Sequence, residues 1–104
     1  MPQKRQGRIG AELVLFDVLG ARWALRVLWE LGGDPLTYRG IAERVPGLST
    51  SVLTRRIREL RAAGLIEHES GAGYRLTKQG QGVLTYLTGL AEWAQRARFG
   101  PRSD

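Results

Sequence analysis

The stretch from Leu48 to Leu65 constrains the fold of this chain more than any other. Apolar residues recur in it at the three- and four-residue spacing of a helix that turns one face toward a core, at Leu53, Ile57 and Leu60. The sequence therefore predicts an amphipathic helix here, and the rest of the chain has to supply the surface that covers its apolar face.

Both ends of this helix are marked in the sequence. Ser49 is a suitable N-cap, since its hydroxyl can accept a hydrogen bond from the free N–H groups of the first turn. Gly64 suits the left-handed position that follows a helix, where Leu65 would fold back onto Leu60 in a Schellman motif. We therefore expect the helix to run from Ser49 to Ala63.

The opposite face of this helix is polar and basic. Its members are Thr50, Ser51, Thr54, Arg55, Arg58 and Arg61, with Arg56 at the edge. A DNA major groove about 12 Å wide admits such a helix, and hydroxyl and guanidinium groups suit base edges and phosphates. A solvated basic face is the alternative, but it usually alternates acids and bases in i,i+4 pairs, and Glu59 is the only acid in this stretch. We favour contact with nucleic acid.

Length and charge agree with a small nucleic-acid-binding protein. The chain has 104 residues, enough for one domain, and carries 16 Lys and Arg against 10 Asp and Glu. Its net charge of +6 favours polyanions, with nucleic acid first and an anionic membrane surface second. No apolar run approaches the roughly 20 residues of a membrane span. Because residues 1–8 lack the apolar segment of a signal peptide, we expect a soluble cytoplasmic protein.

The chain begins with a basic segment, residues 1–8, that contains Lys4, Arg5 and Arg8 and no acid. Such arms can lie along phosphates or in a minor groove. A disordered, solubilising tail is an equally good interpretation. Residues 9–98 form the predicted domain, and residues 99–104 form a tail.

Two helices are predicted before the basic helix. Apolar residues of the first, Ile9 to Leu19, cover more than the one stripe that a surface helix needs, which suggests a partner chain. The second, Ala21 to Leu31, is apolar on most sides and is predicted to be the central core element. Its Trp23 and Trp29 are interpreted as core residues, with a ligand pocket as the alternative.

A helix-turn-helix follows. Residues 36–37 form a possible very short strand, and residues 38–45 form a short helix that Pro46 ends, because the residue before a proline is pushed out of the helical region. A tight link then leads to the Ser49 cap. Two short helices in this arrangement, the second with a polar basic face, are typical of the DNA-binding motif.

A short β-hairpin is predicted after the basic helix. Its strands are residues 65–69 and 74–76, joined by Ser70-Gly71-Ala72-Gly73, where glycines supply positive φ angles. A hairpin in this position is a wing. His68, the single histidine, is interpreted as a strand residue of this wing and not as a ligand or a base.

The last predicted helix starts after a Thr77 cap and runs to about Arg98. It carries two apolar stripes, Val83, Leu87, Leu90 and Ala94 on one side and Tyr86, Leu90 and Trp93 on the other. It also contains three glycines that cost about 1 kcal/mol each against alanine, Gly80, Gly82 and Gly89. Packing against another backbone would offset that cost, and a weak first turn is the alternative interpretation of the early glycines. Two stripes again exceed what one small core needs.

Catalytic chemistry has no support in the sequence. The chain has no cysteine, and its single histidine has no serine and acid in a recognisable arrangement. The acids are scattered and no metal-ligand spacing is present. We expect a protein that is not an enzyme and that has no cofactor, metal or catalytic site.

Four segments in order resemble the HxlR-type winged-helix transcriptional regulators, which are related to the MarR group. They are 17–23, DVLGARW, similar to D-V-I-G-G-K-W; 35–38 and 46–49, PLTY and PGLS, similar to G-P-x-R-F and L-P-G-I-S; 53–60 and 64–67, LTRRIREL and GLIE, similar to L-T-x-R-L-R-E-L and G-L-V-E; and 74–80 with 92–93, YRLTKQG and EW, similar to Y-x-L-T-x-x-G and E-W. The resemblance covers residues 17–93.

This resemblance implies a mainly α-helical, winged helix-turn-helix regulator with N- and C-terminal dimerisation helices. Such a regulator is a bacterial homodimer that represses or activates transcription from pseudo-palindromic double-stranded DNA operators. The helix from Ser49 to Ala63 would enter the major groove, and the two symmetric copies would lie one DNA turn apart, about 34 Å. The first and last helices would build the dimer, which agrees with their surplus apolar stripes. The candidate interface residues on these helices are Leu13, Phe16, Tyr86, Leu90 and Trp93.

The expected DNA contacts fall into two groups. The candidates for base edges are Ser51, Thr54 and Arg55. The candidates for phosphates are Ser49, Thr50, Arg56, Arg58 and Arg75. Arg56 or Arg58 can instead pair with Glu59 or another acid inside the fold.

The sequence departs from the family pattern in three places. Many members carry an N-terminal cysteine that senses oxidants or aldehydes, and this chain has none, so that mechanism is excluded. The predicted wing is shorter than usual and has Glu67 and Glu69 beside it, so we expect it to reach the minor groove poorly. Thr50 and Ser51 stand where proline and lysine are common, and a different base preference is expected.

Two other functions stay open. One is a ligand-responsive sensor, with a small-molecule effector bound near Trp23, Trp29 and Trp93 at the dimer interface. The other is a winged helix used for contact with RNA or with an acidic protein.

Overall fold

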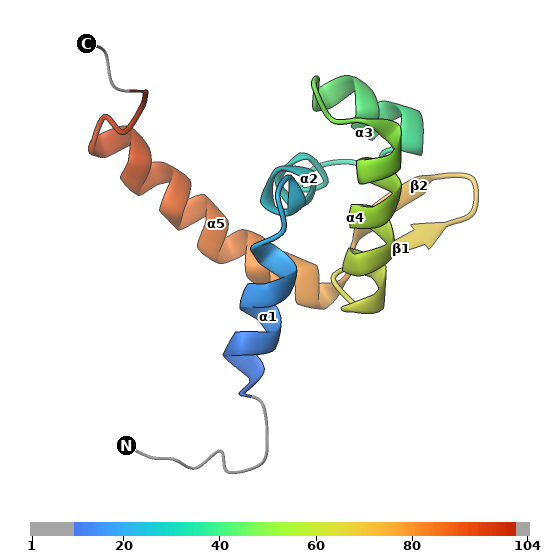
Figure 1. Ribbon diagram of the computed structural model, residues 1–104, viewed down its shortest axis with the longest axis horizontal. Helices are drawn as coiled ribbons and strands as arrows, with labels where there is room; N and C mark the ends of the chain where they lie inside the picture. The colour runs from blue at the N-terminus through green and yellow to red at the C-terminus, as the bar shows by residue number, and fades with distance from the viewer. Residues whose placement is uncertain (1–9, 102–104) are drawn as a thin grey trace.

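The computed structural model of the chain describes residues 10–101, so the predicted basic arm at 1–8 and the last three residues of the tail lie outside the described part. Within it, the elements follow in the order α1 (Ala11–Leu19), α2 (Ala24–Glu30), α3 (Tyr38–Arg44), α4 (Thr50–Ala62), β1 (Ile66–Glu69), β2 (Gly73–Leu76) and α5 (Lys78–Arg96) (Figure 1). This order confirms the predicted fold class, a mainly α-helical winged helix-turn-helix.

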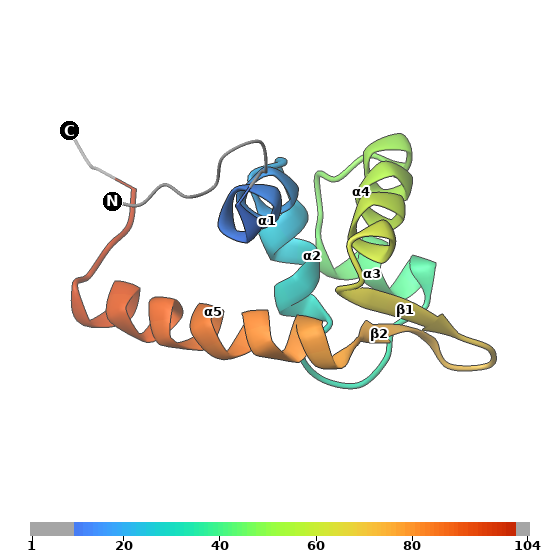
Figure 2. The ribbon, with the colours of Figure 1, turned by 90° about the horizontal axis from the view of Figure 1, so that it is seen from below.

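The long helix α5 projects out of the body of the molecule. Figure 2 shows α5 along one side, extending well beyond α2, while α4 and the hairpin lie together at the other end. The described chain measures 45 × 44 × 24 Å along its principal axes, so it is a flattened body with long arms.

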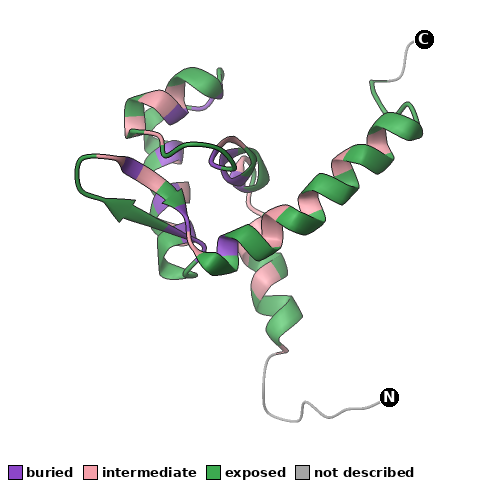
Figure 3. Cartoon of the chain, turned by 180° about the vertical axis from the view of Figure 1, so that it is seen from behind, coloured by how far each residue is buried: buried purple, intermediate pink, exposed green. Residues whose placement is uncertain are grey.

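The core lies between α2, α3, α4 and the hairpin. Its buried apolar residues are Ala24, Val27, Leu28, Leu31, Ile41, Val45, Leu48, Leu53, Ile57, Leu60, Leu65, Ile66 and Leu76. Helix α1 contributes no buried residue, and α5 contributes only Gly80 (Figure 3). The two outer helices therefore leave most of their apolar surface uncovered in the single chain.

Helix α4 has the ends that the sequence predicted. The Ser49 hydroxyl accepts from the N–H of Val52 at 3.2 Å, which is the N-cap contact. Gly64 takes φ +77, and the N–H of Leu65 donates to the carbonyl of Leu60 at 3.0 Å, as in a Schellman motif. The predicted bounds are confirmed to within one residue at each end.

Helix α2 starts three residues later than predicted. Trp23 takes φ +80, and the helix begins only at Ala24. The carbonyl of Arg22 accepts a hydrogen bond from the Arg56 side chain at 2.7 Å, where a longer helix would use it for its own ladder.

The prediction that α2 is buried on most sides was also wrong. Its inner face is in the core, but Leu25 and Trp29 are exposed on the side that faces α5. The apolar residues of this outer side therefore belong to a surface of the chain, which α2 shares with α5.

The hairpin is close to its predicted position. Strands β1 and β2 are antiparallel and pair Ile66 with Leu76 and His68 with Tyr74. The very short strand expected at 36–37 is a single bridge, in which Leu36 and Tyr74 exchange backbone hydrogen bonds of 3.0 and 2.7 Å. Strand β2 starts at Gly73, one residue earlier than predicted. Gly73 takes φ +105, and an added Cβ there would collide with the backbone of Leu36, so this position suits only glycine.

The remaining boundaries differ by one or two residues. Helix α1 begins at Ala11 rather than at Ile9, which lies outside the described residues. Helix α3 ends one residue before the expected end, and α5 ends at Arg96, two residues before Arg98, which takes φ +55. The Thr77 cap of α5 is confirmed by its hydroxyl, which accepts from the N–H of Gly80 at 3.1 Å.

Candidate nucleic-acid interface

The exposed face of α4 carries arginines whose charge the described chain does not neutralise. Arg55 and Arg58 are exposed, and within residues 10–101 neither makes a hydrogen bond or an ion pair. The guanidinium of Arg61 lies 6.0 Å from the ring centre of Tyr74, in a cation–π contact that leaves its charge in place. This set, Arg55, Arg58 and Arg61, is the basic face of α4.

Glu59, the single acid of α4, forms an ion pair with Arg56 and not with the basic face. Arg56 turns toward the core, where its side chain is only 11% exposed, and its Nη1 donates to the Glu59 carboxylate at 2.9 Å. Its Nε donates to the carbonyl of Arg22. Arg56 therefore forms the internal ion pair with Glu59, which the sequence offered as an alternative to a phosphate contact. Arg58 takes no part in that pair.

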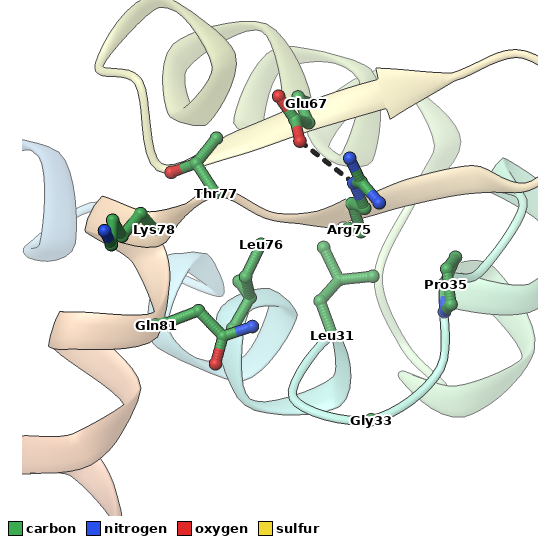
Figure 4. Close-up of a pocket in the computed structure, with 9 residues that line it drawn as sticks. All are labelled: Leu31, Gly33, Pro35, Glu67, Arg75, Leu76, Thr77, Lys78 and Gln81. Carbon is green, nitrogen blue, oxygen red and sulfur yellow. Dashed lines mark hydrogen bonds and ion pairs between the residues drawn. The ribbon is translucent and has the colours of Figure 1, made fainter.

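Arg75 of the hairpin is engaged by acids on the neighbouring strand. Its guanidinium lies 2.9 Å from Glu67 and 2.7 Å from Glu69. Figure 4 shows Arg75 and Glu67 together in a surface hollow that also includes Pro35 and Lys78. Successive strand residues point to opposite faces, so Arg75 lies on the face away from Tyr74 and the basic face of α4.

The wing therefore has no surplus of positive charge. From Glu67 to Arg75 it contains two acids and one arginine, which gives −2 + 1 = −1 with His68 neutral. His68 lies on β1 as expected, with its ring edge-on to Tyr74 at 4.8 Å. A hairpin of this charge is a poor phosphate-binding element.

Hydroxyl groups gather at the start of α4. Ser49, Thr50, Ser51 and Thr54 are all exposed, and the hydroxyls of Ser49 and Ser51 lie 3.4 Å apart. The first turn of a helix presents free N–H groups and a partial positive charge to an anion. These side chains and N–H groups continue the basic face of α4 toward the helix N-terminus.

Tyr38 is part of this surface, although no pattern in the sequence pointed to it. Its hydroxyl lies 2.9 Å from the carbonyl oxygen of Thr50 and 3.0 Å from Oγ1 of Thr54. Tyr38 is the first residue of α3, twelve and sixteen residues before its two partners, so no helical or strand period connects them. Only the packing of α3 against α4 brings these groups together.

The five residues predicted for a dimer interface are all exposed in the single chain. They are Leu13, Phe16, Tyr86, Leu90 and Trp93, and Tyr86 is 81% exposed. Val14, Leu25, Trp29 and Phe99 are exposed large apolar residues as well. These side chains lie on α1, α2 and α5 and on the segment that follows α5, so each of these elements exposes apolar surface.

The three tryptophans lie at different places in residues 10–101. Trp29 lines an apolar groove of about 300 Å³ between α2 and α5, together with Leu87 and Leu90. Trp23 lines a different hollow next to Gly20. The ring centre of Trp93 lies 6.3 Å from that of Phe99, near the end of α5.

Residues 10–101 contain no group of three or more His, Cys, Asp or Glu side chains placed to hold a metal ion. No helix in the same range is long and apolar enough to cross a membrane.

Comparison with known proteins gives consistent matches over most of the chain. A family model described as HxlR-like helix-turn-helix matches residues 18–99. An uncharacterized HTH-type transcriptional regulator from Methanothermobacter thermautotrophicus is 33% identical over 88 residues, which are 79% of this chain and 67% of that protein. A possible HxlR family transcriptional factor from Thermoplasma volcanium GSS1 has a similar structure, with a TM-score of 0.76, 26% identity, and 95% and 98% of the two chains covered. The quinone-bound YodB from Bacillus subtilis has a TM-score of 0.74 and 25% identity, with 85% of this chain and 99% of that chain covered.

Proposed function

Because the chain belongs to the HxlR-like helix-turn-helix family and its relatives are named transcriptional regulators, not enzymes, we propose that it binds a specific DNA operator as a homodimer. In this proposal it regulates transcription from that operator in the cytoplasm. The observation that carries the proposal is the basic face of α4, whose arginines have no acidic partner in the described chain.

The proposed contacts follow from which side chains are available. Ser51, Thr54 and Arg55 face outward near the start and middle of α4 and are assigned to base edges in the major groove. Ser49, Thr50 and Arg58 are assigned to phosphates on either side of the groove.

Two arginines are left out of the proposed contacts. Arg56 and Arg75 were candidates for phosphates from sequence, but their guanidinium groups are held by carboxylates of the same chain. Using either one on DNA would require an existing ion pair to open. The positive charge that α4 can offer to DNA therefore comes from its basic face, Arg55, Arg58 and Arg61.

The proposed dimer is supported by the apolar surface over α1 and α5. A monomer seldom exposes so many large apolar side chains on two helices, and such surface is typical of a protein interface. In a symmetric dimer the same patch serves both chains. Two α4 helices about 34 Å apart would then contact the two halves of a pseudo-palindromic operator.

A fluorescence-anisotropy titration tests this function. The duplex upstream of the chain's own gene is compared with a scrambled duplex over a series of salt concentrations. We expect at least about 10³-fold tighter binding to the specific duplex, and a steep fall of affinity with salt as counterions are released. If the upstream duplex shows no preference, selection from a random duplex pool supplies the operator.

The contradicting results are specific as well. A selection that enriches no duplex, or tighter binding to RNA or to an acidic protein than to any duplex, would refute the proposal. The matched control is the double variant Arg55→Ala with Arg58→Ala, which removes two charges from the basic face without removing an internal contact.

A small-molecule effector is a second candidate function, compatible with the first. The groove between α2 and α5 is apolar and includes the exposed ring of Trp29. A similar structure, YodB, is described as quinone-bound. Tryptophan quenching in a metabolite screen tests this role, and Trp29→Phe should abolish the quenching if the groove is the site.

A further inference from the structure

The hydroxyl of Tyr38 has one proton and two hydrogen-bond partners. A carbonyl oxygen can only accept, so the proton of Tyr38 goes to the carbonyl of Thr50, 2.9 Å away. The contact of 3.0 Å between Tyr38 and Thr54 then requires Thr54 to donate. The single hydroxyl proton of Thr54 is therefore directed to Tyr38, inside the protein.

We propose that Tyr38 makes Thr54 a hydrogen-bond acceptor toward DNA, so that Thr54 selects the exocyclic amino group of an adenine or a cytosine. This inference rests on the proposed function and adds a base preference to one of its contacts. Thr54 is exposed on α4, and its oxygen keeps lone pairs that the hydrogen bond to Tyr38 does not use.

The chemistry of the major groove gives this arrangement its selectivity. Adenine N6 and cytosine N4 present N–H donors there, whereas guanine O6, guanine N7 and thymine O4 present acceptors. A free threonine hydroxyl rotates to serve either kind of group. A hydroxyl whose proton is already committed can only accept, so it should reject a base that presents an acceptor at that point.

The position of Tyr38 is fixed independently of DNA. It follows Thr37, whose hydroxyl accepts from the N–H of Gly40 at 3.0 Å and caps α3. Its ring is half-buried and packs against the core. Tyr38 is thus a positioning residue: it acts on the base through Thr54 and need not touch DNA itself.

The first part of the test locates the contact. An operator is selected from a random duplex pool with the wild-type protein, and each adenine and cytosine is then replaced by purine or 2-pyrimidinone, which lack the amino group. We expect one position in each half-site where removal of the amino group weakens wild-type binding about three- to tenfold. The Thr54→Val variant, which has no hydroxyl, should lose this sensitivity at that position only.

The second part tests Tyr38. All four base pairs are placed at the located position and titrated with the wild type and with Tyr38→Phe, which keeps the ring and removes the hydroxyl. The ratio of the weakest to the tightest dissociation constant among the four base pairs should be about three- to tenfold smaller for Tyr38→Phe than for the wild type. The reason is that Thr54 regains a proton to donate. Affinity for a scrambled duplex and the melting temperature show whether the variant is folded, and Thr54→Ser serves as a control that retains a hydroxyl.

The outcomes separate this inference from the function on which it rests. A protein that enriches no duplex contradicts the proposed function and this inference with it. An enriched operator whose amino deletions cost the same in the wild type and Thr54→Val overturns the inference alone. So does a folded Tyr38→Phe variant with the wild-type spread over the four base pairs.

Discussion

Arg56 donates a hydrogen bond from Nε to the carbonyl oxygen of Arg22 at 2.7 Å, which ties α4 to the turn before α2. That turn contains Trp23 at φ +80, a conformation that costs a bulky residue of the order of 1–3 kcal/mol. The guanidinium of Arg22 lies 5.2 Å from the Trp23 ring centre. The side chain of Arg56 thus helps to hold a strained turn that joins the helix-turn-helix to α1.

Arg56→Ala should destabilise the protein by about 2 kcal/mol. The change removes two hydrogen bonds of a charged group and leaves the Arg22 carbonyl without its side-chain partner. Urea unfolding followed by circular dichroism measures the loss. Arg55→Ala, an arginine next to it with no partner in the described chain, should stay within about 0.5 kcal/mol of the wild type. Equal stabilities of the two variants would contradict a structural role for Arg56.

Gly80→Ala and Gly82→Ala should change stability in opposite directions. A Cβ at Gly80 would collide with the carbonyl of Leu65, whereas a Cβ at Gly82 would meet nothing within 4 Å. We expect Gly82→Ala to stabilise the chain by about 1 kcal/mol through helix propensity, and Gly80→Ala to destabilise it by more than about 2 kcal/mol. Thermal unfolding of the two variants side by side measures both shifts. A destabilised Gly82→Ala variant would indicate that a second chain packs there.

Much of the fold could be predicted from local signals. The caps at Ser49 and Thr77, the left-handed Gly64 and the stop at Pro46 act on neighbouring residues, so the sequence alone defines them. The start of α2 could not be predicted in this way. It depends on Arg56, which is 34 residues away from the carbonyl that it binds.

The sequence predicted which residues form the candidate site better than it predicted their hydrogen bonds and ion pairs. The basic face of α4 follows from helical spacing. Helical spacing places Arg56 at the edge of that face, but the sequence left open whether Arg56 or Arg58 pairs with an acid, and it did not indicate the carbonyl of Arg22 as a partner. The two hydrogen bonds of Tyr38 likewise need the relative position of α3 and α4.

Arg55→Ala and Arg58→Ala should weaken DNA binding in different ways. Arg55 is assigned to a base, so its loss should cost about 1–3 kcal/mol and relax the preference at one position. Arg58 is assigned to a phosphate, so its loss should weaken all duplexes alike and lower the salt slope by about 1 per contact. Anisotropy titrations with specific and scrambled duplexes over a salt series distinguish the two. An unchanged base preference in Arg55→Ala would reassign that residue to the backbone.

The double variant Glu67→Gln with Glu69→Gln should bind non-specific DNA more tightly. It releases Arg75 from both acids and changes the net charge of the wing from −1 to +1. A released cation near the duplex adds counterion release, so the salt slope should become steeper by about 1 per chain. The matched control is Glu43→Gln, which removes an exposed acid on α3. A duplex affinity equal to that of the wild type at every salt concentration would place the wing more than about 10 Å from the phosphates.

Leu90→Glu should convert the proposed dimer to monomers without unfolding the chain. Leu90 is 58% exposed on α5, so a single chain tolerates a carboxylate there. At a symmetric interface both copies would bury that charge next to apolar groups, and we expect the dissociation constant to rise at least roughly a hundredfold, about 3 kcal/mol. Sedimentation equilibrium gives the constant, and circular dichroism shows whether the fold is intact.

Thr88→Glu is the matched control, because it adds the same charge to an exposed position of the same helix, 200° around its axis at 100° per residue. If Thr88→Glu dissociates the dimer and Leu90→Glu does not, the interface lies on the other side of α5. If both variants and the wild type sediment as monomers, two half-sites cannot be occupied by a preformed dimer, and the cooperativity of operator binding must come from the DNA.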